Sequence, residues 1–129
     1  MANTEFRTDS KFAAVTGNSA STTSNPDNAT LLFTCPSSFE AEIVFLKVSN
    51  DQSSNSNIGI QIYDNAFTTY NTFVLVQTIA GNSSEQFITS GPLYLHEGDK
   101  VFIYRHTSSH NFSATLSCRL YYSPAKRLQ

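Results

Sequence analysis

The sequence lacks tryptophan altogether and has few charged side chains. Lys, Arg, Asp and Glu make up 14% of its 129 residues, against the roughly 25% that is usual in globular domains. The net charge is −2, and no basic stripe is present, which argues against a nucleic-acid partner. No run approaches the ~20 apolar residues that span a bilayer, which argues against a membrane partner. A weakly charged surface rich in Ser, Thr and Asn favours association with other protein chains.

The residue constellations of catalysis and metal binding are also missing. No Gly-x-Ser-x-Gly motif is present. His106 and His110 flank an expected loop, with no cluster of carboxylates or cysteines near them in the sequence. Asp64, Glu97 and Asp99 fall at expected loop ends, where carboxylates cap turns. The sequence therefore predicts no catalytic residues, no metal site and no cofactor, and we expect a protein that is not an enzyme.

The two cysteines, Cys35 and Cys118, form no Cys-x-x-Cys pair. Both fall within apolar strand patterns, which favours two small buried thiols. A disulfide between the first and last strands of the sandwich is the alternative.

Apolar residues alternate along most of the chain, as they do in half-buried strands. Ile58, Ile60 and Ile62 share one face of their segment, and six apolar residues alternate over 112–122. In segment 39–50, the alternation places Val44, Leu46 and Val48 on one face, with Ile43 and Phe45 on the other. About eight short strands, separated by turn signals every ~8–12 residues, predict an all-β, antiparallel β-sandwich of jelly-roll or Ig-like type.

The polar composition of residues 1–28 predicts a flexible N-terminal arm, with one short strand around 12–16. Residues 29–122 are expected to form the sandwich domain, and residues 123–129 a short basic C-terminal tail. The first residues lack the apolar segment of a signal peptide, so we expect a protein that stays in the cytoplasm in which it is made or leaves it by a route that needs no signal.

Several aromatic residues lie opposite the expected core faces. A second core layer would explain some of them, and a subunit interface, where Tyr and Phe are enriched, would explain the others. A sugar-stacking platform is a third explanation, which the lack of tryptophan weakens. With residues of the arm and tail added, the candidate interface residues are Phe6, Phe12, Phe45, Tyr63, Phe102, Tyr104, Tyr121, Lys126 and Arg127.

Two blocks of the sequence carry a resemblance. Segment 42–50 (EIVFLKVSN) precedes a polar loop and an Ile-rich strand, and the block GPLYLHEGDKVFI follows later. The order of these blocks over residues 29–122 resembles small β-sandwich virion proteins of tailed bacteriophages. In those proteins a strand ends in Val-x-Asn, and a Leu-x-x-Gly-Asp-x-Ile/Val turn precedes another strand. The matching residues here are Val48, Asn50, Leu95, Gly98, Asp99, Val101 and Ile103.

The resemblance implies a non-enzymatic structural protein located on the virion and assembled in the host cytoplasm. The role it favours is capsid decoration, in which a cement protein stabilises the head through contacts between subunits. It implies a homo-oligomer such as a trimer, with the major capsid protein or another virion protein as partner. A tail, neck or fibre-associated component is one alternative, and a carbohydrate-binding adhesion module with a glycan partner is another.

Overall fold

The computed structural model describes residues 6–15, 30–50, 52–105 and 112–122. These residues form nine strands: β1 (Phe6–Val15), β2 (Thr30–Thr34), β3 (Phe39–Asn50), β4 (Ser56–Asp64), β5 (Thr69–Ile79), β6 (Ser83–Gln86), β7 (Leu93–Leu95), β8 (Lys100–Arg105) and β9 (Phe112–Tyr122).

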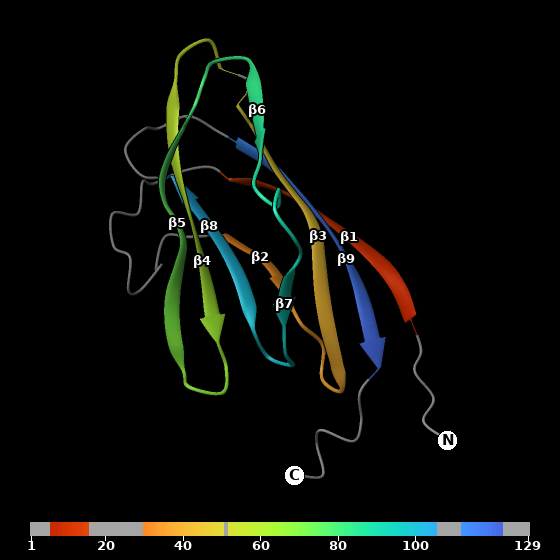
Figure 1. The fold of residues 1–129 in the computed structure, drawn as a ribbon. Coiled ribbons are helices and arrows are strands. Elements are labelled where there is room, and N and C mark those ends of the chain that lie inside the picture. The colour runs from red at the N-terminus through yellow and green to blue at the C-terminus, as the bar shows by residue number, and fades with distance from the viewer. Residues whose placement is uncertain (1–5, 16–29, 51, 106–111, 123–129) are drawn as a thin grey trace.

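The strands form two sheets that face each other (Figure 1). Sheet A has the order β1-β9-β3-β6, with β7 also paired to β3, and sheet B has the order β2-β8-β4-β5. All of the pairings are antiparallel. The predicted antiparallel β-sandwich is confirmed.

The core lies between the two sheets, and alternation places its residues on β4 and β9. On β4, Ile58 and Ile60 are fully buried, and on β9 the buried residues recur at every second position from Ala114 to Leu120. Cys35 and Cys118 are both free and buried, as the apolar pattern predicts. The period-2 signal therefore places the inner faces of these two strands correctly.

A β-bulge corrects the predicted faces of β3. Ile43 pairs with Cys118, but the next paired residues are Phe45 and Ser117, so Val44 is an extra residue in β3. Ile43, Leu46 and Val48 consequently all face the core. The prediction that Ile43 lies opposite Leu46 and Val48 is wrong, because it assumed one unbroken alternation.

The N-terminal residues also differ from the prediction of a flexible arm over 1–28. Residues 6–15 form β1, which pairs with β9 over its whole length, from Phe6 opposite Tyr121 to Val15 opposite Phe112. Sheet A therefore includes an edge strand that the predicted domain limit at residue 29 left out. The other residues of the predicted arm, and the predicted tail over 123–129, lie outside the described residues.

One end of the sandwich is fastened by a single buried aspartate. Asp99 Oδ1 accepts a hydrogen bond from the backbone N–H of Asn65 at 2.9 Å, and Oδ2 accepts one from His96 at 2.8 Å. The backbone oxygen of Asp99 also accepts a hydrogen bond from the N–H of Cys35 at 2.9 Å. Gly98 beside it has φ +85°, a conformation that favours glycine. The β4–β5 turn, the β7–β8 turn and the end of β2 are thus held together at the lower end of Figure 1.

The edge of sheet A beside β3 is interrupted. β7 pairs with Ala41–Ile43 and β6 with Lys47–Asn50, so neither strand pairs with the middle of β3. The side chain of Gln86 fills the break, because its Oε1 accepts hydrogen bonds from the N–H groups of Leu46 at 3.2 Å and Ile88 at 2.7 Å. A side chain therefore replaces strand pairing at this point.

Candidate functional site

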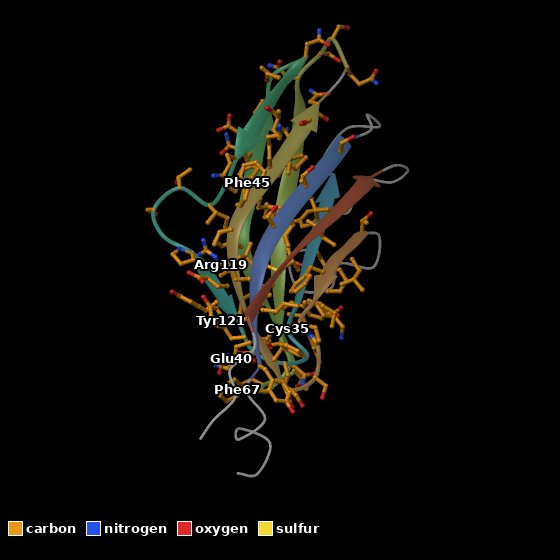
Figure 2. All side chains as sticks on the ribbon, turned by 90° about the vertical axis from the view of Figure 1, so that its right-hand side faces the viewer. Cys35, Glu40, Phe45, Phe67, Arg119 and Tyr121 are labelled. Atoms are coloured by element: carbon orange, nitrogen blue, oxygen red, sulfur yellow. The ribbon has the colours of Figure 1, made fainter. Side chains whose placement is uncertain are left out.

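The outer surface of sheet A, here called the A face, carries two of the predicted aromatic residues. Phe45 and Tyr121 lie on β3 and β9 among charged side chains (Figure 2). The Tyr121 hydroxyl donates a hydrogen bond to Glu42 Oε1 at 3.0 Å, and Arg119 Nη1 lies 3.6 Å from the same oxygen. The hydrogen bond to Glu42 raises the pKa of Tyr121 above its usual value. The A face is therefore a polar surface in which the tyrosine joins a charged network.

The outer surface of sheet B, here called the B face, carries a row of aromatic rings. The ring of Tyr70 lies between Tyr63, with centroids 4.9 Å apart, and Phe102, with centroids 5.9 Å apart. The ammonium of Lys100 lies 4.9 Å from the centroid of Tyr63. Leu31, opposite Phe102 in the sheet, is 48% exposed. The predicted residues Tyr63 and Phe102 thus belong to one apolar stripe, which Tyr70 and Leu31 extend.

Gln61 is the polar residue within this stripe. It lies on β4, opposite Phe102 on one side and Thr72 on the other, and it is fully buried. Neither its side-chain oxygen nor its side-chain nitrogen has a hydrogen-bond partner. Leaving a buried amide unpaired costs roughly 1–3 kcal/mol. The B face therefore holds an unpaired polar group among half-buried rings.

Tyr104 does not belong to the exposed part of the B face, contrary to its selection as an interface residue. It is 0% exposed, and it lies opposite Gly59 on β4, a position without a side chain. Burial raises the pKa of its hydroxyl. The strand register places Tyr104 on the outer side of sheet B, and its burial separates it from the partly exposed rings of the B face.

The structure describes the predicted interface residues to different extents. Phe6 and Phe12 lie on β1, where only their backbone register is described, opposite Tyr121 and Thr115. Lys126 and Arg127 lie outside the described residues. The remaining candidates divide between the A face and the B face, so the aromatic residues form two surfaces of different chemistry.

A groove at the lower end of the sandwich was not predicted. This edge groove has a volume of about 580 Å³ and lies between the β4–β5 turn and β7. Its apolar lining is Ile62, Leu93 and Leu95, and two aromatic side chains stand beside them, Phe67 at 75% exposure and Tyr94 at 65%. The volume falls in the range of ligand sites. An aromatic residue within the Asp- and Asn-rich turn at 64–67 was the sequence signal that could have indicated it.

The edge groove is acidic. Asp64, Glu97 and Asp99 line it, and no lysine or arginine of the described part of the chain is among its lining residues. All three carboxylates also accept backbone hydrogen bonds: Asp64 from Ala66 at 3.0 Å, Glu97 from Ser38 at 2.7 Å, and Asp99 as described above. The carboxylates are therefore fixed in place by the turns that carry them.

Neither thiol chemistry nor metal chemistry is indicated where the structure is described. Burial, followed by the charge of Asp99, raises the pKa of Cys35 to about 12, so its thiol stays protonated and a poor nucleophile at neutral pH. Among the described residues, no group of three His, Cys, Asp or Glu side chains could hold a metal ion. The same part of the chain contains no helix of the length and apolarity that crossing a membrane requires.

No protein-family model and no curated protein matches the sequence. Among solved structures, the chain is similar to one from the T13 viral particle of IBDV, with a TM-score of 0.59 and 12% identity. It is also similar to a chain of the cyanophage Pam1 capsid, with a TM-score of 0.49, 16% identity and coverage of 92% of this chain and 85% of that one. A chain from the disulfide-linked pili of Bacillus endospore appendages gives a TM-score of 0.49 and 12% identity, over 95% and 91% of the two chains.

The likeness to the IBDV particle covers 95% of this chain and 33% of the viral chain. The protein thus spans about a third of the length of that chain. Nearly all of the protein has a β-sandwich fold that occurs in an icosahedral virus particle.

Proposed function

We propose that the protein is a non-enzymatic structural component of a virion, with capsid decoration or cementing as its role. The observation that carries the proposal is the fold, since 95% of the chain superimposes on part of a virus-particle chain. A sandwich of two antiparallel sheets offers two outer faces for contacts with neighbouring subunits.

The B face is the surface that we propose for contact with neighbouring subunits. Tyr63, Tyr70, Phe102 and Leu31 form a continuous stripe. Aromatic residues of this kind are enriched in the buried centres of interfaces. A standard interface buries ~1,600 Å² in total, and many repeated copies on a capsid multiply modest affinities through avidity.

Two measurements test the proposal. Native mass spectrometry of the purified full chain should give an oligomer, and a Leu31→Glu, Phe102→Ser double variant should give monomers that retain their β-rich circular dichroism. A Phe45→Ser variant on the A face is the matched control and should keep the oligomer. A wild-type monomer that also fails to bind purified capsids from the same source would overturn the proposal.

Electron microscopy with an antibody against the chain then locates it on particles. An even coat over the head supports decoration. Label at one pole supports the tail, neck or fibre alternative and overturns the decoration role.

A further inference from the structure

The edge groove combines two chemistries that call for one kind of ligand. Ile62, Leu93 and Leu95 give it an apolar lining, and Phe67 and Tyr94 add exposed rings beside it. The charged groups of the lining are all carboxylates, apart from the imidazole of His96. A ligand with one apolar side chain and one or two cations would satisfy both features, whereas an anionic ligand would be repelled.

The groove is also held in shape before any ligand arrives. Asp99 joins the turn that carries Phe67 to the turn that carries Glu97, through hydrogen bonds to Asn65 and His96. Glu97 is fixed in turn by the N–H of Ser38 at 2.7 Å. Because these carboxylates do not have to be ordered on binding, a ligand loses less affinity to conformational entropy.

One segment of this chain has the matching composition. Residues 123–129 have the sequence SPAKRLQ. This segment contains the cations Lys126 and Arg127 and the apolar Leu128, and it contains neither Asp nor Glu. A proline within a peptide reduces the backbone entropy that the peptide loses on binding, because its ring fixes φ.

The position of the preceding strand brings this segment to the correct end of the molecule. β9 ends at Tyr122, which pairs with Phe39 at the lower end of Figure 1, where the edge groove also lies. β3 separates β9 from β7, so Leu95 lies about two strand spacings away, roughly 10 Å. Seven extended residues reach about 23–25 Å. Either the same copy or a neighbouring one can therefore supply the segment.

We propose that the edge groove is the binding site of the basic segment 123–129 of this chain. Lys126 and Arg127 lie against Asp64 and Glu97, and Leu128 packs on the apolar lining between Phe67 and Tyr94. The pairing is independent of the virion role, since it depends only on the charge and shape of the groove.

A peptide-binding experiment tests the pairing in the full chain. The receptor is the Lys126→Gln, Arg127→Gln variant, which cannot compete for its own groove, and the probe is fluorescently labelled SPAKRLQ. Fluorescence anisotropy should show saturable binding that weakens as salt rises from about 0.05 M to about 0.5 M, because exposed charge pairs are screened. Wild-type protein should bind the same probe more weakly, because its own segment occupies the groove.

Matched variants locate the site on the receptor. Asp64→Asn with Glu97→Gln retains both hydrogen-bond acceptors but removes two charges, and should raise Kd about tenfold, since each exposed pair contributes a few-fold. Phe67→Ala should also weaken binding while leaving the fold intact, because its ring is 75% exposed. Glu85→Gln, an exposed carboxylate on β6 that does not line the groove, should leave Kd unchanged.

Three results would overturn the pairing. The first is no saturation by about 1 mM peptide. The second is equal binding of the peptide SPAQQLQ, which would remove any role for the two cations. The third is neutral-glycan binding on an array that Phe67→Ala abolishes, without peptide binding, which would assign the groove to sugars. None of these results bears on whether the chain coats a capsid.

Discussion

The A face and the B face are both the outer surfaces of antiparallel sheets in one sandwich, yet they hold their tyrosines differently. On the A face, the Tyr121 hydroxyl donates to Glu42 beside Arg119, so the residue belongs to a charged network. On the B face, Tyr63 and Tyr70 contact other rings, and Gln61 beneath them has no hydrogen-bond partner. Alternation alone gives both sets of residues the same outward direction.

The difference shows that the outward direction of a tyrosine on a strand does not determine whether it contacts charged groups or other rings. The polar network of the A face is compatible with contact to water, because its charges remain solvated. The B face presents half-buried apolar rings to the solvent, and the unpaired amide of Gln61 destabilises it. A partner that covers this face would remove the rings from water. We therefore expect substitutions on the B face to have the larger effects, and the following predictions rank them.

The largest difference is expected between Tyr104 and Tyr121. Tyr104→Ala removes a fully buried ring and should lower the free energy of unfolding by about 3–5 kcal/mol. Tyr121→Ala removes a partly exposed ring and should lower it far less. Urea unfolding followed by circular dichroism measures both changes, and equal losses would show that the two faces pack alike.

Gln61 should give a change of opposite sign. Gln61→Met replaces an unpaired buried amide with an apolar chain of similar shape, and should raise the free energy of unfolding by about 1–3 kcal/mol. The matched control is Asn50→Leu, because Asn50 is equally buried but its Nδ2 donates to Ser54 at 2.9 Å and Ile79 at 3.1 Å. The control substitution should lower the free energy of unfolding. If both variants lowered it, the unpaired amide of Gln61 would not be destabilising.

Alkaline pH should weaken the core that both faces cover. The pKa of Cys35 rises from 9.0 to about 12 in the folded protein, so between these values the unfolded chain loses a proton that the native state keeps. Stability is complete below pH 9 and falls as pH rises towards 12, by at most about 1.4 kcal/mol per pH unit. Cys35→Ala should flatten this part of the stability curve, and an unchanged slope would exclude the thiol as its source.

The smallest effect concerns protonation on the A face. Glu42→Gln weakens the hydrogen bond and removes the charge that raise the pKa of Tyr121, so that pKa should fall towards its usual value. The pKa of Tyr104, which burial raises, should not change. NMR titration of ring-labelled tyrosine separates the two, and a shift of both would mean that the faces are electrostatically coupled.

The alternation of apolar residues and the turn residues predicted the parts of the fold that depend on neighbours in the sequence. The alternation in β4 and β9, the buried thiols and the turn at Gly98 were all predicted correctly. The short strand predicted around 12–16 overlaps β1, but the polar composition hid its full extent, because β1 forms through pairing with β9, about 100 residues away in the sequence. The bulge at Val44 was not predicted either, because an extra residue in β3 can be recognised only from its pairing with β9.

The candidate surfaces were harder to predict than the fold. Alternation gives the direction of the Tyr104 side chain but not its burial, which depends on residues outside its own strand. The edge groove is assembled from two turns and β7, which are distant in sequence, so no single segment carried its signal.

The break in sheet A has a consequence for how copies of this protein can associate. A long, continuous edge strand offers its free N–H and C=O groups to any other chain, and this is the route to aggregation and amyloid. Here β7 spans three residues and β6 four, and the side chain of Gln86 occupies the gap between them. β5, an edge of sheet B, is bulged twice against β4. Strand-to-strand growth of copies along these two edges is thus hindered, and contacts between copies are left to the side-chain surfaces.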